Sequence, residues 1–170
     1  MTTERTAVAE KDALAVAVGE ALRGQGWTVA TAESCTGGLL ASWLTDVAGS
    51  SDYVLGGIVA YADEAKVKLL GVREATIEKH GAVSAACARE MAQGAQRQLG
   101  ATIAVSITGI AGPGGATPSK PVGLTYIGAA RGRDLIVERH NFAGERGEIK
   151  QAAAQAAMRL ILRLAGDAPG

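Results

Sequence analysis

The chain has 170 residues, of which 48% are hydrophobic and 20% charged, a composition that excludes a disordered tail protein and a disulfide-rich scaffold. Seventeen Lys and Arg residues balance seventeen Asp and Glu residues, so no net field attracts a polyanion and non-specific nucleic-acid binding is not expected. Because aromatic residues make up only 4% of the chain, a stacking platform for single-stranded nucleic acid is not expected either.

The N-terminal segment and the uncharged segments predict a cytoplasmic protein with no membrane partner. Lys11 and Asp12 interrupt the first apolar stretch before it could act as a signal sequence. The longest uncharged run, 101–119, contains four glycines and two prolines, so it does not resemble a membrane helix. Cys35 and Cys87 form no Cys-x-x-Cys motif, which is typical of a protein in a reducing compartment.

Helices and strands alternate in the first hundred residues. The apolar spacing predicts them in the order helix 8–23, strand 27–33, helix 39–47, strand 53–62, helix 63–70, a short helical piece at 72–80, and helix 85–99. In the first helix it puts Val8, Leu14, Val18 and Leu22 on one face. The glycine pair Gly56-Gly57 predicts a bulge or bend in the second strand. The helix at 63–70 begins like a capped helix at Asp63, and Ser84 is the expected N-cap of the helix at 85–99.

The second half begins with the clearest core strand, at 101–108, which runs into a Gly/Pro loop over 109–121. A β-hairpin is predicted from two strands at 122–130 and 135–142, followed by a helix that carries Ile149 to Leu164 on its apolar face. The element order predicts an α/β fold. We expect one domain over 1–170, with its core at about 8–165. It should have three layers, a sheet between two layers of helices (αβα). The sheet should be mixed and mostly parallel, closing with the C-terminal hairpin and helix.

The first candidate site segment is Thr31-Ala-Glu-Ser-Cys-Thr-Gly-Gly-Leu39, where a strand ends and a helix begins. Free backbone N–H groups and the positive end of the helix dipole would stabilise an anion or an oxyanion there. Gly37 and Gly38 allow a ligand to approach the main chain. Ser34 or Thr36 is then a nucleophile, a hydrogen-bond donor to a phosphate, or only an N-cap.

Cys35 is the neighbouring candidate nucleophile. A catalytic cysteine usually requires a histidine that lowers its pKa, and neither His80 nor His140 lies in a segment with a pairing signal. We therefore interpret Cys35 and Cys87 as packing residues. The two histidines are also too far apart in the sequence to suggest a dedicated metal site.

The second segment places Tyr61 and Lys66 at another junction between a strand and a helix. If this junction meets the first one at the mouth of the sheet, Ser34, Tyr61 and Lys66 form a metal-free hydrolase site. Lysine accepts a proton only as the neutral amine, so such a site must be partly desolvated. The competing interpretation is a surface lysine and a tyrosine at the edge of the core.

Two more segments are candidates for ligand contact. The core strand that ends at Thr108 and Gly109 enters a glycine loop, the usual place for a ligand-contacting loop in an open α/β sheet, although a flexible connection would look the same. Its spacing is neither that of a Walker A motif nor that of a dinucleotide fingerprint. Arg146 precedes the last helix, where it is either a clamp for a carboxylate or phosphate or an exposed side chain.

Taken together, eight segments closely resemble the CinA C-terminal domain family over residues 8–165. These segments are Thr-Ala-Glu-Ser-Cys-Thr-Gly-Gly (31–38), Ala-Gly-Ser-Ser (48–51), Tyr-x-x-Glu-Ala-Lys (61–66), Leu-Gly-Val (70–72), His-Gly-Ala-Val-Ser (80–84), Thr-Gly-Ile-Ala-Gly-Pro-Gly-Gly (108–115), Lys-Pro-Val-Gly (120–123) and Phe-x-Gly-x-Arg (142–146). The characterised members of this family are nicotinamide-nucleotide amidohydrolases. Longer members carry an additional N-terminal domain and are linked by name to competence.

The resemblance implies hydrolysis of the carboxamide of nicotinamide mononucleotide to nicotinate mononucleotide and ammonia, without a cofactor, for reuse in NAD synthesis. It places the catalytic set on Ser34, Lys66 and Tyr61, and it implies substrate contacts at Thr36, Thr108 and Arg146. We expect Lys66 to accept the serine proton, while an electrostatic Lys66 with Tyr61 as the base is the alternative.

A ligand-binding module without turnover, acting as a nucleotide sensor, is the rival hypothesis. The presence of all three residues of the catalytic set argues against such a degenerate binder. A role in DNA processing conflicts with the absence of a basic stripe. The sequence does not determine the oligomeric state, and it is compatible with a homo-oligomer.

Overall fold

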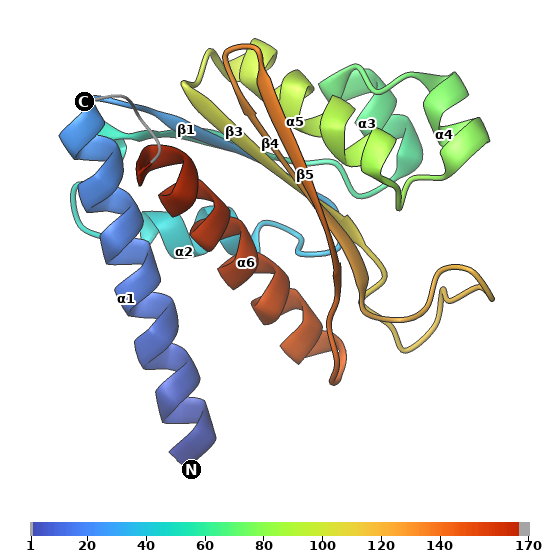
Figure 1. Cartoon of the computed structure of the whole chain (residues 1–170), viewed down its shortest axis with the longest axis horizontal. Helices are drawn as coiled ribbons and strands as arrows, with labels where there is room; N and C mark the ends of the chain where they lie inside the picture. The colour runs from blue at the N-terminus through green and yellow to red at the C-terminus, as the bar shows by residue number, and fades with distance from the viewer. Residues whose placement is uncertain (1, 167–170) are drawn as a thin grey trace.

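The computed structural model describes the backbone of residues 2–166 and the side chains of residues 8–166, and it shows a sheet between two layers of helices (Figure 1). The helices are α1 (Thr2–Gln25), α2 (Leu39–Thr45), α3 (Asp63–Leu70), α4 (Glu74–His80), α5 (Ala85–Leu99) and α6 (Arg146–Gly166), with a 3-10 turn at Ser50–Asp52. The strands are β1 (Val29–Glu33), β2 (Val54–Val59), β3 (Ile103–Gly109), β4 (Leu124–Arg131) and β5 (Asp134–Asn141).

The five strands form one mixed sheet in the order β2-β1-β3-β4-β5. β1 pairs in parallel with both β2 and β3, whereas β4 and β5 form the C-terminal antiparallel hairpin. The predicted α/β class, mixed sheet and hairpin are therefore confirmed. Since β1 and β3 run in parallel beside each other, the segments that follow them emerge at the same edge of the sheet.

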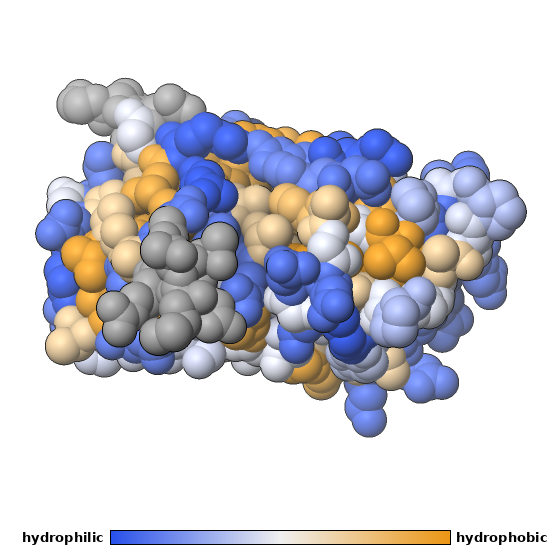
Figure 2. Space-filling view, turned by 90° about the horizontal axis from the view of Figure 1, so that it is seen from below, coloured by the Kyte–Doolittle hydropathy of each residue, from blue (hydrophilic) through white to orange (hydrophobic). Residues whose placement is uncertain are grey.

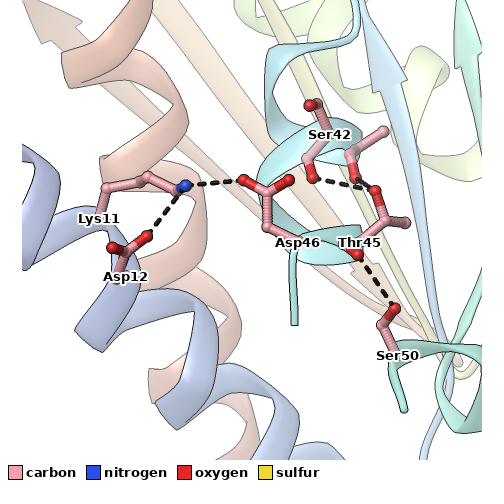
Figure 3. Close-up of polar contacts among 7 residues, drawn as sticks. Lys11, Asp12, Ser42, Thr45, Asp46 and Ser50 are labelled. Atoms are coloured by element: carbon pink, nitrogen blue, oxygen red, sulfur yellow. Dashed lines mark hydrogen bonds and ion pairs between the residues drawn. The ribbon is translucent and has the colours of Figure 1, made fainter. Parts of the chain in front are cut away.

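The two helical layers cover opposite faces of the sheet. α1, α2 and α6 contact one another, and α6 packs on β3 and β4, whereas α5 lies across β1, β3 and β4 with α3 and α4 beside it (Figure 1). Lys11 joins α1 to the end of α2 through an ion pair with Asp46, with 2.7 Å between Nζ and Oδ2 (Figure 3). In the space-filling view from below, hydrophobic patches alternate with hydrophilic ones (Figure 2).

Local details bear out most of the predicted elements. The register of β1 against β2 shifts where Val29 faces Val54 and Ala30 faces Gly56, which is the predicted bulge. Ser84 caps α5 by accepting the N–H of Cys87 at 3.1 Å. None of the described helices combines the length and apolar character needed to cross a membrane.

Two predictions, one about the buried face of the first helix and one about the cap of α3, are wrong. Val8, placed on the buried face of the first helix, is 57% exposed, because Glu10 forms an ion pair with Arg159 of α6 and the contact between the helices is polar at that level. At α3 the N-cap position is occupied by Ala62, with no side-chain cap. The carboxylate of Asp63 contacts Lys66 instead.

Candidate active site

A cleft of about 270 Å³ lies where β1 and β3 end and where α3 and α6 begin. Its lining comes from five segments of the chain: Ser34, Cys35, Tyr61, Asp63, Lys66, Ala82, Val83, Thr108, Gly109, Ile110, Ala111, Gly112, Gly114, Gly115 and Arg146. The structure therefore brings together the three predicted catalytic residues, and Thr108, Gly109 and Arg146 with them. The carboxyl edge of a parallel sheet is where ligands bind in open α/β folds.

Ser34 is the first residue after β1, and the neighbouring strand fixes its position. Its backbone N–H donates to the carbonyl oxygen of Ile107 in β3 at 3.0 Å, and its own carbonyl accepts the N–H of Gly37 at 3.0 Å. The residue is only 8% exposed. A serine held in this way presents its hydroxyl from a rigid strand end, as a nucleophile requires.

Glu33 occupies the start of α2, which the sequence predicted to be a free anion site. Its buried carboxylate accepts the N–H groups of Leu40 and Ala41 at 2.9 and 3.0 Å, and the hydroxyl of Thr31 at 3.3 Å. These helix N–H groups are therefore satisfied within the chain, and the prediction that they are free is wrong. Glu33 also links β1 to α2 across the segment that carries Ser34, so it acts as a positioning residue.

Lys66 is buried, with 2% of its surface exposed, so the interpretation as a surface lysine is wrong. Its Nζ donates to the carbonyl oxygen of Tyr61 at 3.0 Å and to Oδ1 of Asp63 at 3.4 Å. A neutral amine has two N–H groups and an ammonium has three, so either form of Lys66 can make these two contacts.

Tyr61 and Arg146 meet at the mouth of the cleft. The Tyr61 side chain is 60% exposed, and its hydroxyl oxygen accepts a hydrogen bond from Nη2 of Arg146 at 3.2 Å. Nη1 of the same guanidinium donates to the carbonyl oxygen of Gly112 at 2.8 Å. Arg146 therefore joins the glycine loop to Tyr61, while the phenolic proton of Tyr61 remains available for donation.

The strand end at Thr108 and Gly109 shapes the wall of the cleft. The hydroxyl of Thr108 donates to the carbonyl oxygen of Ala82 at 2.8 Å, which attaches β3 to the segment before α5. A Cβ at Gly109 would lie 2.9 Å from the carbonyl oxygen of Leu124, so the approach of β4 excludes a side chain there. Thr108 thus reaches the cleft with its hydroxyl already engaged.

Thr36, Gly37 and Gly38 are not among the described residues that line the cleft. Gly37 and Gly38 have left-handed backbone conformations, with φ of 62° and 99°, and form the turn into α2. Thr36 is buried, and its hydroxyl has no hydrogen-bond partner among the described residues. Lys150 lies nearby, with Nζ 4.0 Å from where a Cβ of Gly37 would be.

The two thiols are in environments that disfavour the reactive thiolate. Burial raises the pKa of Cys35 to about 11, and the Glu33 carboxylate acts in the same direction, whereas Lys150 and Arg146 oppose them to a smaller extent. Burial likewise raises the pKa of Cys87 to about 11. Both side chains are therefore protonated thiols at neutral pH, although Cys35 lines the cleft.

Sequence reasoning missed Glu33, Asp63 and the pair Ala82 and Val83 as parts of the site. Glu33 stands four residues before the glycine turn into α2, and the attraction of acidic side chains to helix N-termini is a signal that could have identified it. Asp63 stands three residues before Lys66, the spacing at which helix side chains meet. No local signal marks Ala82 and Val83, which reach the cleft only through the packing of α5 on the sheet.

The geometry can be compared with known proteins. The model of the CinA C-terminal domain family matches residues 11–165. A CinA-like protein of Syntrophomonas wolfei is 49% identical over 154 residues, and a putative competence-damage inducible protein of Moorella thermoacetica is 47% identical over 154 residues. Each match covers 91% of this chain but 37% of the relative, so the chain spans little more than a third of the length of these relatives.

Solved structures agree over nearly the whole fold. The crystal structure of competence/damage inducible protein CihA from Agrobacterium tumefaciens is 39% identical, with a TM-score of 0.89, over 91% of this chain and 95% of that one. The competence damage-inducible protein A from Klebsiella pneumoniae is 34% identical, with a TM-score of 0.91, over 94% and 99%. This chain therefore belongs to the CinA C-terminal domain family.

Proposed function

We propose that this chain hydrolyses the carboxamide of nicotinamide mononucleotide, giving nicotinate mononucleotide and ammonia. The observation that carries the proposal is the convergence of Ser34, Lys66 and Tyr61 on one cleft, from three different segments of the chain. A nucleophile, a proton acceptor and a proton donor are the groups that amide hydrolysis needs. The names of the relatives state no reaction, so the substrate rests on the sequence resemblance.

In the proposed reaction the hydroxyl oxygen of Ser34 attacks the amide carbon, and the lone pair of neutral Lys66 takes the serine proton. The C–N bond then breaks. The leaving nitrogen receives a proton from Lys66 or through the Tyr61 hydroxyl, and departs as ammonia. Water next attacks the ester on Ser34, and the serine oxygen leaves with a proton to release nicotinate mononucleotide.

The oxyanion of this reaction requires donors other than the first helical N–H groups of α2. The carboxylate of Glu33 already binds those of Leu40 and Ala41. We assign the role instead to the backbone N–H group of Cys35, which lines the cleft beside Ser34. Glu33 would keep the turn after Ser34 in place during the reaction, since preorganised donors are what stabilise developing charge.

We expect purified protein to release ammonia from nicotinamide mononucleotide and to keep doing so after exhaustive chelation. The reason is that residues 8–166 contain no group of three His, Cys, Asp or Glu side chains placed to hold a metal ion. Ammonia release is measured with and without chelator, with free nicotinamide as the comparison substrate. Activity that disappears with chelator and returns with a divalent ion would contradict the metal-free mechanism. Nucleotide binding without ammonia would support a binding module.

Replacing Arg146 with Ala is expected to raise KM for nicotinamide mononucleotide by about 10- to 100-fold, the effect of losing a charge-assisted hydrogen bond. Two of the five guanidinium N–H groups bind Tyr61 and Gly112, which leaves others for a phosphate. For nicotinamide riboside, which lacks the phosphate, KM should rise much less. An equal rise in KM for both substrates would show that Arg146 acts only by holding Tyr61 and the glycine loop.

A further inference from the structure

Among the described residues that line the cleft, Asp63 carries the only carboxylate, and the proposed reaction does not use it. Its Oδ1 lies 3.4 Å from the buried Nζ of Lys66. The proposed base is the neutral amine of Lys66, whereas a carboxylate at this distance stabilises the ammonium. The charge of Asp63 therefore opposes the proposed role of Lys66.

The first turn of α3 brings the two groups together. Helix side chains point toward the N-terminus of their helix, so Lys66 reaches back over the three residues that separate it from Asp63. There its Nζ also donates to the carbonyl oxygen of Tyr61 at 3.0 Å. This second contact is the shorter one and involves only backbone oxygen, so it would hold the amine in place if Asp63 lost its charge.

The Asp63 carboxylate has no other attachment. Its side chain is 58% exposed, and within residues 8–166 it makes no hydrogen bond except the one with Lys66. Since neither the cap of α3 nor the core depends on it, its charge can be removed while the fold is kept.

Asp63 also lines a groove of about 420 Å³ between α3 and α4, on the side away from the cleft. The other charged side chains of this groove are Glu64, Lys68, Glu74 and Glu78. All four are exposed, so water and salt screen their effect on the buried amine. The groove therefore adds no charge comparable to that of Asp63.

The remaining ionisable groups near the amine come from the cleft, from α5 and from the glycine loop. Around the amine and its neighbour on α5 they are Cys35, Tyr61, Arg146, Cys87, Glu90 and Lys120. Both thiols are uncharged at neutral pH, because burial raises their pKa to about 11. Glu90 is bound by Arg73, and Lys120 and Arg146 are themselves positive. Asp63 is therefore the negative group that acts directly on the amine in the described part of the chain.

We propose that Asp63 sets the lower pH limit of the reaction, because its carboxylate holds a proton on Lys66 that must leave before Lys66 can act as the base. Lys66 releases this proton to solvent, and the fraction of enzyme that has released it rises with pH. The inference rests on the proposed function, since it takes the neutral amine as the base. Asp63 acts through Lys66 and needs no contact with the substrate, so it is a positioning residue.

The first test is the pH dependence of kcat/KM for nicotinamide mononucleotide, which reports ionisations of the free enzyme. Asp63→Asn keeps the size of the side chain and its carbonyl oxygen but removes the charge. We expect its acid limb to move to lower pH by about one unit or more, the shift typical of losing an adjacent opposite charge. Relative to its own plateau, the rate on that limb should then rise about tenfold.

Two further variants separate charge from structure. Asp63→Glu keeps the charge, so its acid limb should stay close to that of the parent chain. Glu64→Gln is the matched control, because Glu64 is the next residue of α3 and lines the groove but not the cleft, and its limb should not move. A purely structural role for Asp63 would lower the rate of Asp63→Asn by one factor at every pH. That result, or an equal shift in Glu64→Gln, would overturn the proposal.

The second test does not require turnover. In protein labelled with ¹³C-lysine, the Cε resonance of Lys66 reports the charge of its amine, and Lys66→Arg assigns that resonance by removing it. We expect the titration midpoint of Lys66 to be lower in Asp63→Asn than in the parent chain, and unchanged in Glu64→Gln. An unchanged midpoint in Asp63→Asn would refute the action of Asp63 on Lys66. A lower midpoint in a chain that releases no ammonia would support that action and refute the proposed amide hydrolysis, so the two proposals fail separately.

Discussion

Replacing Ser34 with Ala is expected to reduce kcat for nicotinamide mononucleotide by roughly 10⁴- to 10⁶-fold, the loss typical of removing a nucleophile from a hydrolase. Ser34 is held by its own backbone hydrogen bonds to Ile107 and Gly37, and neither needs the hydroxyl. The variant should therefore fold normally and still bind the substrate. Ammonia release and calorimetric titration with the substrate measure the two quantities separately.

Cys35→Ala is the matched control, because Cys35 is the adjacent residue and lines the same cleft. Burial favours the uncharged form of a thiol, so a pKa of about 11 leaves Cys35 protonated and weakly nucleophilic across the neutral range. We expect this variant to keep nearly the parent rate. An inactive Cys35→Ala beside an active Ser34→Ala would exchange the roles of the two residues.

The fold was largely predictable because its elements have local signals. The uninterrupted apolar run of β3 marked a fully buried strand, and Gly56-Gly57 marked the bulge that the register of β2 contains. The hairpin followed from two strands around the turn at Gly132. Exposure at Val8 was not predictable in the same way, because it depends on which side chains of α6 reach that level of α1.

The candidate site was predictable in its members but not in its electrostatics. The motif positions of Ser34, Tyr61 and Lys66 indicated one cleft, and the parallel pairing of β1 with β2 and β3 explains why their segments meet. The sequence could not show that Glu33 would fold back onto Leu40 and Ala41, since a buried carboxylate finds its partners only in the folded chain. For the same reason the engagement of Arg146 with Gly112 and Tyr61 was not predictable.

Lys66→Arg is the variant that separates the two roles open to this lysine. Arginine keeps the positive charge and stays protonated, so it cannot accept the serine proton. If Lys66 is the base, Lys66→Arg should lose roughly 10²- to 10⁴-fold in kcat, nearly as much as Lys66→Ala. Lys68→Ala, two residues further along α3 and exposed, is the control for changes of charge on this helix and should retain the parent rate.

Lys66 is buried, with 2% of its surface exposed, so the larger guanidinium of the Lys66→Arg variant must fit into a space that the native side chain already fills. Circular dichroism and substrate binding therefore accompany the rates, and a folded, substrate-binding Lys66→Arg protein that is inactive supports the base. The contacts with the Tyr61 carbonyl and Asp63 suit either charge state of the amine, so they do not decide the role. Substantial turnover by Lys66→Arg would instead make Lys66 an electrostatic anchor. The base would then be Tyr61, whose hydroxyl lies beside the Arg146 guanidinium.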